Sequence, residues 1–145
     1  MSLSIFDRGE GRFDLMHGDI EIGWVRDRAI GFNGFGDRAT ARRAAAVAYD
    51  ALTGWLARQR RFDAPPRNGH ALRVERDGGI DQLMLGEVPV GQLLHRGAGI
   101  ADGGYAFELT LPPRIGATLS AAQIMYYALE RYRAGRDLGQ MVEVA

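Results

Sequence analysis

The residues most often used in catalysis are scarce in this chain. Its histidines are His17, His70 and His95, and none is spaced with another histidine or a carboxylate as a metal-binding helix requires. Serine is equally rare, and Ser120 suits the cap of a helix better than a nucleophile, because no G-x-S-x-G segment surrounds it. We therefore predict no catalytic residue and no metal site.

Two residue types are missing altogether, and their absence excludes several kinds of chemistry. All 18 basic residues of the 145 are arginine, and there is neither lysine nor cysteine. Schiff-base catalysis, the Walker A loop, disulfides, thiolate zinc sites and iron–sulfur clusters are thereby excluded. Acidic residues gather in the first 25 positions, but nothing fixes two of them at a catalytic separation, and a solvated edge is the simpler interpretation. The sequence favours a protein that is not an enzyme and uses no cofactor.

A basic middle segment is the candidate binding surface. Between residues 26 and 76 there are eleven arginines and five acidic residues, whereas both flanks are net acidic and the whole chain is neutral. Arginine beside aromatic rings can contact the phosphates of a single nucleic-acid strand while the rings stack on its bases. The residues of this hypothetical anion-binding or nucleic-acid-binding face are Trp24, Arg26, Arg28, Arg38, Arg42, Arg43, Arg58, Arg60 and Arg61.

Simpler interpretations of these residues stay open. The last three arginines crowd the end of an expected helix, where positive charge stabilises the helix dipole without any ligand. Trp24, Phe32 and Phe35 are typical of a hydrophobic core. The glycine-rich stretch 31–36 could hold an anion before a helix, but a tight turn explains its glycines equally well and Asp37 opposes an anion.

The most informative pattern is an internal repeat. Residues 15–23 align with 83–91 at an offset of 68, and the leucine, the methionine and both glycines are identical. A second match relates 44–55 to 121–132 at an offset of 77. The difference between the offsets predicts an insertion of nine residues in the second copy, near 96–104. The alternative is chance similarity between two glycine-rich hairpins.

Each copy is expected to form four antiparallel strands and one helix. Glycine turns separate short segments with alternating apolar side chains, as in hairpins. Helices are predicted at about 39–61, capped by Asp37 or Thr40, and from Ser120 to near Gly135, with a short tail strand at 141–145. Pro89 falls within a predicted strand, which must therefore be an edge strand or carry a bulge.

The predicted fold class is α+β. It consists of two tandem ββββα repeats, each an antiparallel meander sheet followed by one helix, packed with pseudo-twofold symmetry. The predicted divisions are a first repeat at 1–62, a linker at 63–70, a second repeat at 71–135 with its insertion near 96–104, and a C-terminal tail at 136–145.

This architecture resembles that of PUR repeats and Whirly proteins. Gly11-Arg12-Phe13, which enters a predicted strand, is similar to a Gly-Arg-Phe of PUR repeats. Both families bind single-stranded nucleic acid on their sheets, so the resemblance implies such a partner here. The absence of lysine and the acidic second copy depart from a typical binding face of this kind.

Taken together, the sequence favours a non-catalytic interaction or assembly module. One four-stranded sheet with one helix has a thin core, so association with a second copy or a protein partner would bury more apolar area. The first alternative is a single-stranded nucleic-acid-binding protein that uses the arginine-rich face. An enzyme or small-ligand protein stays open as a third class, which would require a deep cleft lined by His17, Asp19 and Glu21. No signal-peptide pattern and no apolar run of membrane-spanning length are present, so we expect a cytoplasmic location and no membrane contact.

Overall fold

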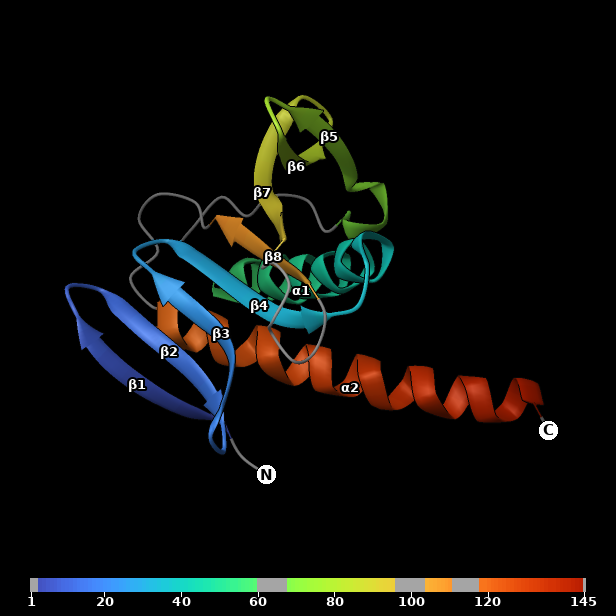
Figure 1. Cartoon of the computed structure of the whole chain (residues 1–145), viewed down its shortest axis with the longest axis horizontal. Coiled ribbons are helices and arrows are strands. Elements are labelled where there is room, and N and C mark those ends of the chain that lie inside the picture. The colour runs from blue at the N-terminus through green and yellow to red at the C-terminus, as the bar shows by residue number, and fades with distance from the viewer. Residues whose placement is uncertain (1–2, 60–67, 96–103, 111–117, 145) are drawn as a thin grey trace.

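The computed structural model describes residues 3–59, 68–95, 104–110 and 118–144 of the chain. Four strands precede a helix, and four more strands precede a second helix, as the sequence predicts (Figure 1). The strands are β1 (Ser4–Gly9), β2 (Arg12–His17), β3 (Ile20–Arg26), β4 (Ala29–Phe35), β5 (Arg73–Asp77), β6 (Ile80–Leu85), β7 (Val88–His95) and β8 (Tyr105–Thr110). The helices are α1 (Arg38–Gln59), the short 3-10 helix η1 (Gly69–Ala71) and α2 (Thr118–Val144).

All eight described strands belong to one antiparallel sheet. Their order is β1-β2-β3-β4-β8-β7-β6-β5, so each group of four forms a meander and the two meanders join where β4 pairs with β8. The sheet is strongly twisted, and β5–β7 stand at a steep angle to β1–β3 (Figure 1). The fold is therefore α+β, as predicted, with the two halves sharing a single sheet.

The two halves of the sheet have the same irregularity at matching positions. The pairing of β2 with β3 shifts between Leu15 and Met16, and that of β6 with β7 shifts between Leu83 and Met84, 68 residues later. Pro89 pairs with Met84 at the second bulge. Because β7 lies inside the sheet, the bulge and not an edge position accommodates this proline.

Two matching glycines allow neighbouring strands to approach closely. A side chain on Gly23 would collide with the backbone oxygen of Gly31 in β4, and one on Gly91 would collide with the backbone oxygen of Glu108 in β8. The sequence identity of these two glycines therefore has the same physical cause in both halves.

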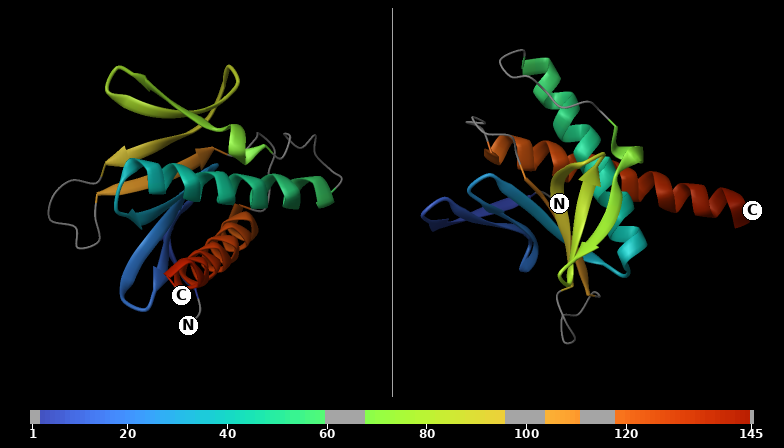
Figure 2. Two further views of the ribbon diagram at one scale, coloured as in Figure 1. Left: turned by 90° about the vertical axis from the view of Figure 1, so that its right-hand side faces the viewer. Right: turned by 90° about the horizontal axis from the view of Figure 1, so that it is seen from above.

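Helices α1 and α2 lie on one face of the sheet and cross each other (Figure 2). Helix α1 packs mainly on β8, with further contacts to β4 and β7, whereas α2 packs on β3 and on α1. The ring of His17 in β2 meets that of Tyr126 in α2 edge-on, with 6.5 Å between the ring centroids. Each helix thus covers strands of the other half, which joins both halves into one core.

The core lies between the helices and the face of the sheet that they cover. Small alanines on both helices permit close packing against large side chains from the strands. The core includes Leu15, Val25, Ile30, Phe32, Phe35, Leu83, Leu93, Phe107 and Leu109 from the strands, with Ala44, Ala45, Leu52, Ala121, Ala122 and Met125 from the helices. The assignment of Phe32 and Phe35 to the core is confirmed.

The ends of the helices confirm one prediction and correct others. The Thr40 backbone N–H donates to the Asp37 carboxylate at 2.7 Å, so Asp37 caps α1 as predicted. Helix α2 begins at Thr118, which places Ser120 inside the first turn and not at the cap. It continues through Gly135 to Val144, so the predicted end near Gly135 and the tail strand are wrong. One glycine inside a helix costs only about 1 kcal/mol, too little to end it.

Most of the predicted linker and insertion falls outside the described residues. Residues 63–67 of the linker and 96–103 of the insertion belong to the undescribed segments. The described end of the linker is anchored on α1, because the Gly69 N–H donates to the Asp50 carboxylate at 2.8 Å.

Candidate nucleic-acid interface

A continuous row of side chains crosses the face of the sheet opposite α1 and α2, here called the helix-free face. Successive side chains of a strand point to opposite faces, so the neighbours of the core residues Val25, Leu93 and Phe107 lie on the helix-free face. The pairing register connects one residue from every described strand. The row is Phe6, Asp14, Trp24, Gly31, Glu108, Gln92, Gln82 and Glu75.

Trp24 is fixed at the centre of this row. Its indole lies over Gly31, where any side chain would collide with the ring. The indole N–H donates to one carboxylate oxygen of Glu108 at 2.6 Å, and the Gln92 amide donates to the other at 3.2 Å. Only 6% of Trp24 is exposed. The ring therefore acts as a rigid wall and not as an open stacking platform.

Three arginines line a pocket beside this wall, here called the arginine pocket. Arg8, Arg12 and Arg26 reach it from β1, β2 and β3, and its volume is about 340 Å³. Its other lining residues are Phe13, Asp14, Glu21, Trp24 and Val25. The pocket therefore combines positive charge with an aromatic wall on the helix-free face.

Two of these arginines directly face each other. Arg12 pairs with Arg26 in the register of β2 and β3, and like charges in such positions destabilise a sheet. Arg8 is different, because its Nε lies 2.6 Å from a carboxylate oxygen of Asp14. Within the described part of the chain, Arg12 and Arg26 make no ion pair and no side-chain hydrogen bond. An anion between them would remove the repulsion.

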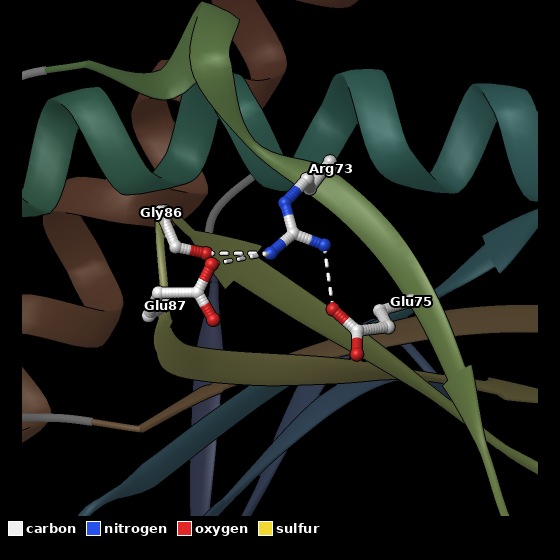
Figure 3. Close-up of polar contacts among 4 residues, drawn as sticks. All are labelled: Arg73, Glu75, Gly86 and Glu87. Carbon is white, nitrogen blue, oxygen red and sulfur yellow. Dashed lines mark hydrogen bonds and ion pairs between the residues drawn. The ribbon is translucent and has the colours of Figure 1, made fainter.

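An arginine of the second half shows what a structural role looks like (Figure 3). Arg73 in β5 lies 2.6 Å from a carboxylate oxygen of Glu75, and it donates to the backbone oxygen of Gly86 at 2.7 Å. The Glu87 carboxylate lies 3.8 Å from the same guanidinium. These contacts tie the edge strand to the β6–β7 turn. The guanidinium of Arg73 is thus held by partners within the protein, whereas the described part of the chain provides no such partners for Arg12 and Arg26.

The structure does not bring the arginines expected from the sequence onto one surface. Arg26 lies in the arginine pocket with Trp24, whereas Arg38, Arg42, Arg43 and Arg58 belong to α1, on the covered side of the sheet. Arg28 follows β3 in an exposed turn, and Arg60 and Arg61 lie outside the described residues.

Two arginines of α1 contact the start of the second half. Arg38 lies 2.9 Å from a carboxylate oxygen of Asp81 on β6, and Arg42 donates to the backbone oxygen of Leu72 at 3.2 Å. Both contacts hold the start of the second half against α1, so neither side chain needs a ligand to explain it.

Sequence reasoning missed three residues of the interface. Arg8 and Arg12 lie in an N-terminal segment that is net acidic, and Phe6 is an exposed edge residue on the same face. The signal that finds them is the two-residue period of the hairpin, which places Arg12 on the side of Asp14 and opposite Arg26.

The described residues contain no group of three or more His, Asp or Glu side chains that could hold a metal ion. Burial raises the pKa of Tyr49, to which the charge of Asp50 adds, and burial together with Glu130 raises the pKa of Tyr126. Both phenols stay protonated at neutral pH and lie in the core, so neither is placed to act as a base.

Comparisons with known proteins leave this geometry as the basis for any functional argument. No family model, no curated protein and no solved structure matches the chain. None of the described helices has the length and apolar character needed to cross a membrane.

Proposed function

We propose that the protein binds single-stranded nucleic acid on the helix-free face of β1–β4. The observation that carries the proposal is the facing pair of Arg12 and Arg26 in the arginine pocket, without an ion pair in the described part of the chain. Phosphate oxygens accept hydrogen bonds from guanidinium groups. Phe6, which is 55% exposed on the same face, supplies a ring on which a base can stack.

We further infer that the two halves are related by a pseudo-twofold axis through the centre of the β4–β8 pairing. Ile30 pairs with Leu109, and Phe32 pairs with Phe107. At an offset of 77 residues Ile30 corresponds to Phe107 and Phe32 to Leu109, so each of the two pairs corresponds to the other. The same offset relates the two helices in the sequence. The matching bulges at an offset of 68 support the same relation further out in the sheet.

This relation supports a binding role for the arginines. Counted from the shared bulge, Ile80 and Leu94 stand in the second half where Arg12 and Arg26 stand in the first. The same scaffold is therefore built without arginine at these positions. Folding therefore does not require the Arg12–Arg26 pair, whereas ligand binding explains its presence.

The resemblance to PUR repeats and Whirly proteins points to the same partner. Both bind single strands on a sheet, and the proposed face is a sheet. In this chain the positive charge comes from arginine alone, and Arg73, which lies on this face in the second half, is already paired with Glu75.

Fluorescence titration of Trp24 with decathymidylate tests the proposal. A Trp55→Phe background leaves Trp24 as the sole tryptophan. Each phosphate contact contributes a slope of about −0.7 to the plot of log affinity against log salt. We expect the Arg12→Gln/Arg26→Gln variant to lose about 1.4 of that slope, whereas Arg58→Gln, on α1, leaves it unchanged. Absence of binding at low salt, or binding that salt does not weaken, would contradict the proposal.

Self-association is a second candidate, favoured by exposed apolar side chains. Large apolar residues about half exposed or more are Phe6, Ile20, Ile80, Val88 and Tyr127. Ile20 and Val88 occupy matching positions after the β2–β3 and β6–β7 turns. The edge strand β5 carries four charged residues, which oppose growth of the sheet by strand pairing.

Analytical ultracentrifugation distinguishes this candidate. Self-association through the hairpin ends predicts a dimer that the Ile20→Asp/Val88→Asp variant dissociates, while Arg58→Gln leaves it intact. A strict monomer at high protein concentration would exclude an assembly role.

A further inference from the structure

We infer that the arginine pocket binds the terminal phosphate of a single strand, so that the protein holds a strand end and not its middle. The inference rests on the proposed function, and it adds which part of the ligand occupies the pocket.

The pair of facing arginines suits a phosphomonoester, because Arg8 already neutralises Asp14 and the lining stays net positive with Glu21 included. Arg12 and Arg26 face each other across adjacent strands, where paired Cβ atoms lie about 4.5–5.5 Å apart. Both guanidinium groups can therefore contact one phosphate. A terminal phosphate carries a charge of about −1.5 to −2 at neutral pH and presents three oxygens, whereas a diester in the chain carries one charge. The terminal group therefore matches two facing cations better.

The row on the helix-free face prevents the strand from continuing toward the second half. Next to the pocket stands Trp24, fixed by its 2.6 Å hydrogen bond to Glu108. Beyond it the row continues through the Glu108 carboxylate to Glu75 on the opposite edge, where Glu75 is already paired with Arg73. A backbone that crossed this region would bring a phosphate close to the Glu108 carboxylate, and like charges at short range repel.

The opposite direction leads past Asp14, whose carboxylate is already paired with Arg8, to the edge of the sheet. Strand β1 is the edge of the sheet, and it carries the exposed ring of Phe6 in the same row as Asp14 and Trp24. A strand whose terminal phosphate lies between Arg12 and Arg26 can place a following base on Phe6. The pocket thus holds the end of the nucleic-acid strand, and the ring of Phe6 marks the direction in which the strand leaves the protein.

Affinity measurements with three forms of hexathymidylate test the inference. The oligonucleotides carry a 5′-phosphate, a 3′-phosphate or hydroxyl groups at both ends, and fluorescence anisotropy of an internal label reports binding. We expect one phosphorylated form to bind at least about tenfold more tightly than the hydroxyl form, which corresponds to one additional charge-assisted hydrogen bond. The preference is expected to shrink below about pH 6, where the terminal phosphate loses its second charge.

Matched variants separate the inference from the proposed function. Arg12→Gln and Arg26→Gln should each abolish the preference for a phosphorylated end, while Arg58→Gln on α1 should keep it. Equal, salt-dependent affinity for all three oligonucleotides would overturn the inference and leave the proposed function standing. If none of the three oligonucleotides binds, both the inference and the proposed function are overturned.

Inorganic phosphate provides a further control. We expect it to displace the phosphorylated strand only at concentrations at least about 100-fold above the dissociation constant of the strand, because it lacks the base that stacks on Phe6. Displacement at equal concentration would assign the pocket to free phosphate and overturn the inference.

Discussion

The half of the sheet formed by β1–β4 and the half formed by β5–β8 share a scaffold but differ in the chemistry of one face. On the covered face, Leu15 and Leu83 match and are both fully buried beside the same bulge. On the helix-free face, the matched positions are Arg12, Trp24 and Arg26 in the first half and Ile80, Gln92 and Leu94 in the second. Packing therefore accounts for what the halves share, and the proposed binding of a ligand to one half is our explanation for what they do not.

Removal of the matched leucines should have the largest effect on stability. Leu15→Ala and Leu83→Ala each remove a fully buried side chain, so we expect each to lower the free energy of unfolding by about 3 kcal/mol. Urea denaturation followed by circular dichroism measures both. Ile20→Ala, at a site that is 61% exposed, serves as the control and should change stability by less than about 0.5 kcal/mol. If only one of the two leucine variants lost much stability, the two positions would not be structurally equivalent.

Substitution of the matched glycines should have the second-largest effect on stability. Gly23→Ala and Gly91→Ala each place a Cβ against the backbone oxygen of a neighbouring strand, and we expect each to cost about 2 kcal/mol. Gly36→Ala is the control, because a Cβ there meets no atom within 4 Å. Thermal unfolding of the three variants checks the prediction, and a neutral substitution at either matched glycine would contradict it.

The sequence predicts the scaffold better than the arrangement of its parts. The offset of 68 was readable because Leu15 and Gly23 have the same packing and backbone demands as Leu83 and Gly91. The alanine-rich face of α1 shows that the helix is buried, but an apolar face carries no information on which strands cover it. The exchange of α1 and α2 between the halves is therefore a property of tertiary packing alone.

The candidate site illustrates a different limit. The segment that contains Arg8 and Arg12 is net acidic, so a charge sum hides two of the three arginines in the pocket. Whether they meet Arg26 depends on the register of the strands. A glycine turn suggests this register, and the bulge after Leu15, three pairs from Arg12, modifies it. Trp24 was readable as buried, but its hydrogen bond to Glu108, 84 residues away, required the joining of β4 to β8.

Trp24 and its counterpart Gln92 should differ in how much they stabilise the sheet. Trp24→Phe removes a 2.6 Å hydrogen bond to a carboxylate, and we expect a loss of about 1.5 kcal/mol. Gln92→Met removes a bond of 3.2 Å to the same carboxylate and should cost about 0.5 kcal/mol. Urea denaturation compares them. Equal losses would mean that Trp24 is not the anchor of the row, and its role as a fixed wall of the pocket would fail.

The facing arginines should give the smallest effect, and its sign is what matters. Arg12→Gln or Arg26→Gln removes a repulsion between like charges, so we expect either variant to be more stable than the original protein by about 0.5 kcal/mol at low salt. The double variant should gain no more than either single variant, because one substitution already ends the repulsion. Added sodium chloride should remove the difference by screening.

The matched positions of the second half provide the contrast for this last effect. Ile80→Gln and Leu94→Gln exchange apolar side chains, so the stability difference that they cause should not respond to salt. If Arg12→Gln instead destabilises the protein at every salt concentration, the arginines hold the sheet together and their presence in one half needs no ligand. If it stabilises the free protein and weakens binding of a single strand, the first half retains a local instability that only an anionic partner relieves, because anion binding to the folded state restores the lost stability.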